Sequence, residues 1–422
     1  MAAKKATPLV PKLRFPQFRD ATNWHFQPLS ELAEPISERV GGKKCVPLSV
    51  TTGVGLVSQE EKFGRIIAGE SYKNYIRLKA NDFAYNKSST KDFPEGYIAR
   101  YTGNEDAAVP NSIFTCFRTS GTAVMPQYLD QLFQANHHGR WLRKYITVGA
   151  RAHGALSVND DDLMSMPVPL PPASASLPEQ QKIANFLGSL DDLIEAERRK
   201  LDILRLHKVG LMQNLFPKSG ETGPTLRFAE FQNQGEWENR KAGSMFANRR
   251  AKGEKGLPLY SVTMNDGMVR RDSFDRNYYD IEEASKNKMA FEGDIVYNMM
   301  RMWQGALGVA HEDCMVSPAY IVLNPKRNVV PKFFEYLFKL PTTLQLLTAH
   351  SRGLTKDRLR LYYDDFARIS LRCPNEPEQK RIADCLSSLD GNISAQVRRL
   401  EMLSLHKKGL LQQLFPTSQS NR

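Results

Sequence analysis

The chain has few cysteines and lacks the signatures of the common catalytic, cofactor and metal sites. Its five cysteines are scattered through 422 residues without CxxC spacing, so neither a disulfide framework nor a zinc site is indicated. No GxxxxGK[ST] loop, HExxH pair, GxSxG elbow or EF-hand loop occurs. We therefore expect a chain without catalytic residues, without a metal and without a bound cofactor.

Long hydrophobic runs are also missing. No stretch approaches the length of a membrane helix, and the first residues contain no apolar run typical of a signal peptide, so we expect a cytoplasmic protein. The formal net charge of +12 favours a polyanionic partner such as nucleic acid. Most of this excess charge lies outside the repeated segments described next.

The dominant feature of the sequence is an internal repeat. Residues 178–217 return as residues 377–416, and the two segments match without a gap at 23 of 40 positions. Each copy follows a longer segment, and those two segments resemble each other only in places, such as Pro11–Phe15 and Pro224–Phe228. A repeat of this length predicts two domain-sized modules with one fold and different surfaces. We expect module one at 1–175, its repeated helix at 176–217, module two at 218–373, and a helix with a tail at 374–422.

Both repeats have the periodicity of long helices. Their apolar residues alternate four and three apart for more than four heptads, and each strip is interrupted by two polar residues. We predict that the two helices pair as an antiparallel coiled coil, which relates the modules by a pseudo-two-fold axis. The alternative is that each helix packs only against its own module. The predicted register pairs Glu197 with Lys407, Lys208 with Gln396, and Leu201 with Leu403.

Each module is predicted to be mixed α/β. Strands are expected at 45–50, 96–100, 112–117 and 318–323, and helices around 126–146 and 331–348. Ser176 and Asn375 precede the repeated helices with the spacing of N-cap residues.

Basic, amide and aromatic side chains recur at corresponding places in the two modules. Such side chains pair with base edges in the major groove, and Lys and Arg also neutralise phosphates. The alternative for any one basic run is a solvated surface. The candidate DNA-binding residues in module one are Lys43, Lys44, Asn86, Lys87, Ser88, Arg140, Arg143, Lys144 and Arg151. Those in module two are Arg249, Arg250, Lys252, Asn298, Arg301, Trp303, Gln304, Arg352, Lys356, Arg358 and Arg360.

Together these features resemble the specificity subunit of type I restriction–modification systems. The resemblance rests on two diverged modules, each followed by a repeated helix that begins Pro-Glu-Gln and ends Leu-Phe-Pro, and on the Arg-Met-Trp-Gln-Gly stretch at 301–305. It implies a non-catalytic subunit that binds a two-part, asymmetric site on double-stranded DNA, with one half-site for each target-recognition domain. The helices would then set the gap between the half-sites.

The resemblance also implies partners. Two methylation subunits would bind S-adenosylmethionine and methylate adenine, and two restriction subunits would add ATP- and Mg²⁺-dependent translocation and cleavage. Two rival hypotheses remain. A fused enzyme would bind S-adenosylmethionine itself, and a structural adaptor that spaces two protein partners would bind no DNA.

Overall fold

The chain folds into two compact units. The computed structural model describes residues 9–51, 53–91, 93–146, 154, 156–273 and 284–416, and the side chains of Ser273 and Lys356 are not described. Unit 1 combines Met1–Arg198 with Arg399–Arg422, and unit 2 is Arg199–Arg398. The long helices α5 (Ser176–Asn214) and α10 (Glu376–Leu414) each contribute residues to both units, whereas the predicted boundaries kept each repeated helix as a separate segment.

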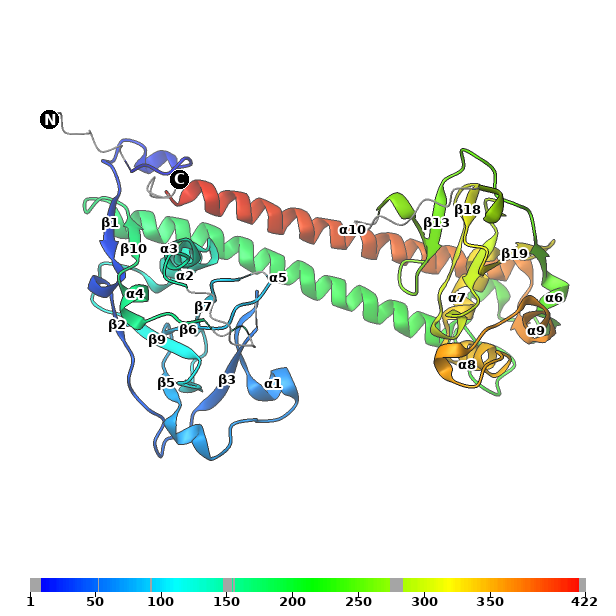
Figure 1. Ribbon diagram of the computed structural model, residues 1–422, viewed down its shortest axis with the longest axis horizontal. Helices are drawn as coiled ribbons and strands as arrows, with labels where there is room; N and C mark the ends of the chain where they lie inside the picture. The colour runs from blue at the N-terminus through cyan, green and yellow to red at the C-terminus, as the bar shows by residue number, and fades with distance from the viewer. Residues whose placement is uncertain are drawn as a thin grey trace. The chain divides into compact units, whose positions relative to one another are not determined.

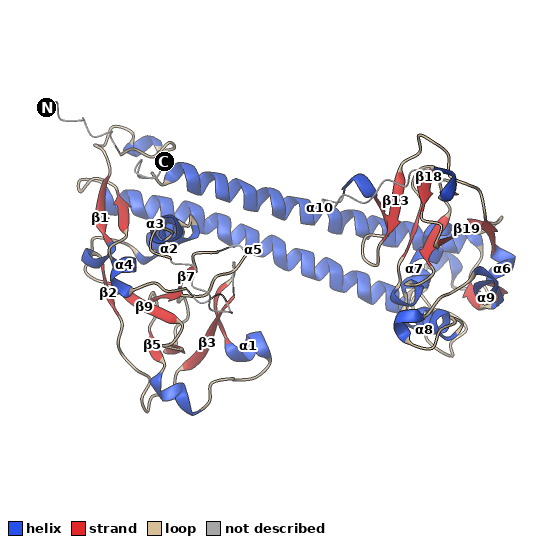
Figure 2. Ribbon diagram, in the orientation of Figure 1, coloured by secondary structure: helices blue, strands red, loops and turns tan. Residues whose placement is uncertain are grey.

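The described residues of unit 1 form two four-stranded sheets and a two-stranded sheet. Their strand orders are β2-β9-β6-β7, β4-β3-β8-β5 and β1-β10, and β3 and β8 are parallel neighbours. Most of its helices are short, as Figure 2 shows in blue. The strands are β1 (His25–Pro28), β2 (Ala33–Pro35), β3 (Val46–Thr51), β4 (Gly55–Ser58), β5 (Ile76–Leu78), β6 (Phe83–Asn86), β7 (Tyr97–Arg100), β8 (Ala107–Val109), β9 (Phe114–Thr119) and β10 (Pro167–Leu170). The helices before α5 are α1 (Gln59–Phe63), α2 (Pro126–Gln134), α3 (His137–Leu142) and α4 (Asp160–Met164).

Unit 2 repeats this topology strand for strand. Its sheets have the orders β12-β19-β16-β17, β14-β13-β18-β15 and β11-β20. Strands β13 and β18, which lie side by side in Figure 1, are again parallel neighbours. The strands are β11 (Glu238–Lys241), β12 (Phe246–Arg249), β13 (Leu259–Val262), β14 (Met268–Arg270), β15 (Lys288–Ala290), β16 (Ile295–Asn298), β17 (Leu307–Val309), β18 (Cys314–Val316), β19 (Tyr320–Pro325) and β20 (Ser370–Cys373). The helices before α10 are α6 (Ala242–Met245), α7 (Pro331–Lys339), α8 (Pro341–Ala349) and α9 (Tyr363–Arg368). Both units therefore have a mixed α/β fold, and the duplication appears in their matching strand orders.

Each unit has a core that includes one end of both long helices. In unit 1, Ile183 and Leu187 of α5 pack in one cluster with Leu411 and Leu414 of α10 and with the aromatic side chains of α2. In unit 2, Leu215 and Phe216, which follow α5, pack in one cluster with Ile382 and Leu386 of α10 and with α7. Burial of these apolar side chains ties each set of sheets to its pair of helix ends.

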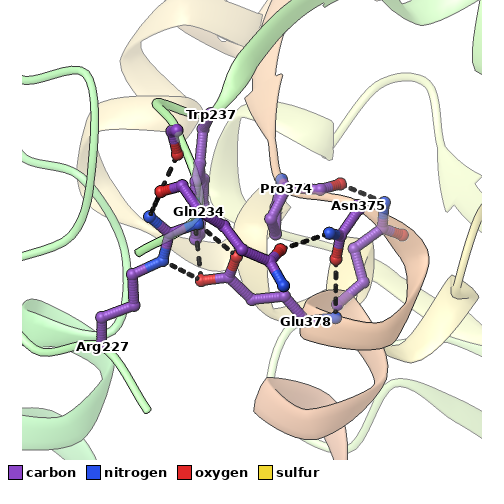
Figure 3. A network of polar contacts seen from close by, with 8 residues as sticks. Arg227, Gln234, Trp237, Pro374, Asn375 and Glu378 are labelled. Carbon is purple, nitrogen blue, oxygen red and sulfur yellow. Dashed lines mark hydrogen bonds and ion pairs between the residues drawn. The ribbon is translucent and has the colours of Figure 1, made fainter. Parts of the chain in front are cut away.

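In each unit a buried ion pair fastens the segment before the first strand to the start of a long helix. In unit 1, Arg14 donates two hydrogen bonds of 2.8 Å to the carboxylate of Glu179 on α5. In unit 2, Arg227 donates bonds of 2.8 and 2.7 Å to Glu378 on α10, and the indole of Trp237 lies 3.3 Å from the same carboxylate (Figure 3). Both carboxylates are 1% exposed, so each contact is shielded from water.

The helix ends run antiparallel within each unit, in a register that differs from the predicted one. The ammonium of Lys407 contacts Asp191 and Gln134, and Lys208 contacts Asp390 at 2.5 Å. The predicted partners of these two lysines were Glu197 and Gln396, so that part of the prediction was wrong.

The observed contacts are related by the repeat itself. Asp191 and Asp390 are equivalent positions, as are Lys208 and Lys407, so one kind of lysine–aspartate bridge forms in each unit. Glu197 is bound by Arg399 at 2.8 Å instead. Heptad spacing identifies the face of a helix that contacts its partner helix but leaves the axial register of the pair open. A long lysine side chain also reaches an acid about two turns away from the residue opposite it in the predicted register. The pairing of Leu201 with Leu403 stays a prediction.

Of the two predicted N-cap residues, Asn375 acts as a cap and Ser176 does not. Asn375 accepts a hydrogen bond of 3.1 Å from the backbone of Glu378, as a cap does. Ser176 is already the first residue of α5, and its hydroxyl accepts a bond from Gln180 instead. Among the described residues, the structure contains no helix with the length and apolar character that crossing a membrane requires.

Candidate nucleic-acid interface

In unit 2, the loop after β16 presents cationic and amide side chains on a rigid turn. The side-chain oxygen of Asn298 accepts a hydrogen bond of 3.1 Å from the backbone of Met300, and the indole of Trp303 donates one of 3.2 Å to the carbonyl of Met300. Met302 is fully buried below the turn. Arg301 and Gln304 are exposed on the turn, so the loop holds them toward solvent.

A second segment, 351–361, lies against this loop. The backbones of Arg352 and Arg360 exchange two hydrogen bonds of 2.9 and 2.8 Å, and the backbone of Leu361 bonds to Met299 at 2.9 Å. Gly353 permits this closure, because a Cβ there would lie 2.6 Å from the carbonyl oxygen of Arg358. The two segments are therefore one rigid surface.

The two segments enclose a concavity of about 450 Å³, lined by Met300, Asp357, Arg358 and Arg360, which we call the arginine hollow. Among the described side chains, neither arginine has an ion-pair partner, and Asp357 has none either. Arg352 at its border is held by Asp365 at 2.6 Å. A surface of free guanidinium groups suits the phosphates and the base edges of DNA.

Unit 1 presents a different set of charged groups among its described residues. Lys87, after β6, forms an ion pair of 3.1 Å with Asp160 of α4. Arg143 donates two bonds of 2.8 and 2.5 Å to Glu95 yet stays largely exposed, and Lys144 lies 3.3 Å from the ring centre of Trp141. Burial favours a raised pKa for Glu95, but the bonds from Arg143 outweigh it and lower the pKa of this carboxyl. The units thus expose unlike sets of cations.

Two predicted DNA-binding residues are placed differently from the prediction. Asn86 and Asn298 end the central strands β6 and β16 and are only 7% and 8% exposed. Their side chains face the interior because both strands are buried along their whole length. Both asparagines end equivalent strands, and the small exposed fraction of each leaves a contact with DNA a prediction.

Several predicted cations are exposed elsewhere on the units. Lys43 and Lys44 lie in the turn before β3, and Arg250 and Lys252 follow β12. Burial and the nearby Arg250 lower the pKa of Lys288.

The remaining predicted residues fall into three groups. Arg249 forms an ion pair of 2.6 Å with Asp294. Arg140 and Ser88 are partly buried. Arg151 lies outside the described residues, as does the side chain of Lys356.

The structure also reveals a repeated apolar feature that the sequence prediction missed. Ile203 and Leu206 of α5 are 65% and 72% exposed, and the equivalent residues of α10, Met402 and Leu405, are 72% and 71% exposed. We call each pair an apolar step; one belongs to each unit. Large exposed apolar side chains that recur in this way indicate contact with a partner protein. Their position off the heptad seam in both repeats was the available signal.

Among the described residues there is no group of three or more His, Cys, Asp and Glu side chains arranged to hold a metal ion. The cysteines are buried or partly buried and unpaired. Burial raises the pKa of Cys314 to about 12, so this thiol is not a ready nucleophile.

Comparisons with known proteins agree with this architecture. Residues 228–403 match the family model described as the type I restriction modification DNA specificity domain. A putative type I restriction enzyme specificity subunit of Methanocaldococcus jannaschii is 22% identical over 80% of this chain and 78% of its own length. The crystal structure of a type I restriction–modification S subunit from M. genitalium has a TM-score of 0.58 at 14% identity and covers 97% of this chain and 100% of that one. A structure reported for complex assembly and conformational transition of the type I R-M system has a TM-score of 0.53 at 17% identity and covers 93% and 97%.

Proposed function

The chain belongs to the family of type I restriction–modification specificity subunits, and from that membership we propose that it directs DNA methylation and cleavage to a two-part, asymmetric DNA site. Subunits of this family are non-catalytic, so no catalytic role is assigned to any residue of this chain. The proposal places the protein in the cytoplasm, where it meets the DNA of the cell.

Each unit reads one half of the site. The observation that carries this proposal is that two units of identical strand order expose different sets of cations among their described residues. In unit 2 these are Arg301, Arg358 and Arg360, and in unit 1 they are Arg143 and Lys144. A common scaffold with different side chains suits two half-sites of different sequence.

The long helices act as a spacer that separates the two half-sites. This role is supported by the antiparallel contacts of the helix ends within each unit and by the repeated lysine–aspartate bridges. In this proposal the coiled coil and its pseudo-two-fold symmetry fix the number of unread base pairs. Insertion of one helical repeat into both helices is then expected to lengthen the gap and leave both half-sites unchanged.

The apolar steps are the docking sites of two methylation subunits. Two equivalent patches fit two copies of one partner, and burial of exposed Ile, Leu and Met supplies the association energy. S-adenosylmethionine binds to those subunits. Restriction subunits, with ATP and Mg²⁺, complete the nuclease.

Methylome sequencing of cells that express the complete system tests the reading function. We expect methylated adenines within one two-part motif. Exchange of residues 1–172 for those of another family member should replace one half of the motif and keep the other. A change in both halves refutes the one-unit, one-half-site assignment, and the unexchanged chain is the control.

Native mass spectrometry tests the docking sites. The Leu405→Lys variant should retain one methylation subunit, and the double variant Leu206→Lys with Leu405→Lys should retain none. Leu354→Lys is the matched control, because Leu354 is 97% exposed and lies off both helices. Retention of two methylation subunits by the double variant would refute the docking site.

A further inference from the structure

The arginine hollow contains an unusual combination of charges for a surface that binds DNA. Asp357 lines it together with Arg358 and Arg360, and no described cation lies within ion-pair distance of the Asp357 carboxylate. Neighbouring residues in the chain thus present a free carboxylate and free guanidinium groups to the same space. If the hollow bound only phosphate, this carboxylate would weaken the binding, because the two negative charges repel each other.

A carboxylate has one favourable type of contact with DNA. It accepts hydrogen bonds, so it suits the exocyclic amino groups of cytosine and adenine in the major groove. At adenine it would also face the acceptor N7 beside that amino group. At cytosine the N4 amino group has no such acceptor next to it on the major-groove edge, so the free carboxylate favours cytosine.

The arginines complete the recognition of the same base pair. Guanine, the partner of cytosine, presents O6 and N7 to the major groove, and a guanidinium group donates to both at once. Arg358 and Arg360 are available for this contact because they have no described ion-pair partner. Arg352 has a different role, since its bond of 2.6 Å to Asp365 holds the segment in place.

Backbone hydrogen bonds join the walls of the hollow, and such bonds favour discrimination between base pairs. The backbone bond from Leu361 to Met299 and the paired bonds between Arg352 and Arg360 fix the two segments relative to each other. Met300 forms an apolar wall that provides no alternative partner for the carboxylate. Fixed donors and acceptors reject a wrong base because its polar groups stay unpaired.

We propose that the arginine hollow reads a C·G base pair in the half-site of unit 2, with Asp357 bound to cytosine N4 and Arg358 or Arg360 bound to guanine O6 and N7. This assignment rests on the proposed function and adds the chemical identity of one base pair. Asp357 is thereby a residue that determines specificity, although it is an acid in a basic surface.

Selection from a pool of random duplex DNA by the full chain tests the proposal. The wild-type chain should enrich a two-part motif with an invariant C·G pair in the half assigned to unit 2. The Asp357→Asn variant should lose between about 5-fold and 150-fold of the preference at that one position and keep the remaining motif. Asp364→Asn is the matched control, because it removes an equivalent exposed charge from α9 outside the hollow and should leave the motif unchanged.

A modified base provides an independent readout. Replacement of the guanine of that pair by 7-deazaguanine removes the N7 acceptor, so it should weaken DNA binding by the wild-type chain. One of the variants Arg358→Ala and Arg360→Ala has lost the guanine contact. The modified base should have little further effect on DNA binding by that variant. A two-part motif that Asp357→Asn leaves unchanged, or weakens evenly at all positions, overturns this assignment and leaves the proposed function standing. A wild-type chain that enriches no motif overturns both.

Discussion

The buried pair between Arg227 and Glu378 should be a main determinant of the stability of unit 2. Arg227→Met removes both hydrogen bonds to Glu378 and leaves a carboxylate that is 1% exposed with only Trp237 as a side-chain donor. Removal of one partner from a buried pair costs about 3–5 kcal/mol. Glu378 lies in the first turn of α10, whose dipole stabilises an anion by up to about 1 kcal/mol. We therefore expect the free energy of unfolding to fall by about 3 kcal/mol.

Differential scanning calorimetry of the full chain measures this loss. For a unit of this size, 1 kcal/mol corresponds to about 2–4 °C in Tm, so the transition of unit 2 should shift down by about 6–12 °C. Arg381→Met is the matched control, because the ion pair of Arg381 with Glu230 is half exposed on both sides and contributes about 1 kcal/mol at most. Equal shifts for the two variants would refute the argument from burial.

Two further variants give distinct outcomes. Burial lowers the pKa of His138 to about 4, whereas an unfolded histidine titrates near pH 6.5. Between these two pH values protons bind preferentially to the unfolded chain. The free energy of unfolding therefore falls as the pH drops from 6.5 to 4. At pH 5.5 the loss is about 1.4 kcal/mol. The variant His138→Gln should remove this part of the pH dependence of the unfolding free energy in denaturant titrations, and an unchanged dependence contradicts the assignment. Arg301→Ala should weaken binding to all duplexes alike and reduce the slope of log affinity against log salt by about 1, as measured by fluorescence anisotropy; an altered base preference would instead assign Arg301 to base reading.

The duplication allowed much of the fold to be predicted from the sequence. The repeat predicted two related modules, and the identical strand orders of the two units bear this out. The order itself could not be predicted, because β3 pairs in parallel with β8 across a long separation in the chain. The axial register of the two long helices could not be predicted either. The heptad seam correctly identified Lys407 as a buried polar position, but its partner, Asp191, lies off that seam.

The candidate site was predicted in part. Residue type alone could not show that Asn86 and Asn298 end buried strands and are less exposed than the neighbouring cations. The cations of 352–360 were found because basic residues cluster there in the sequence. The role of Asp357 required the tertiary structure, since only the contact of two separate loops shows that its carboxylate shares a concavity with Arg358.

The discontinuity of unit 1 has a consequence for biosynthesis. Its core requires Leu410, Leu411 and Leu414, which leave the ribosome after all of unit 2, because unit 2 lies between Arg199 and Arg398. Unit 2 can therefore fold first, while the core of unit 1 stays incomplete until the last turns of α10 have been synthesised. Chains truncated before residue 399 should be recognised by chaperones and proteases through that half of the molecule.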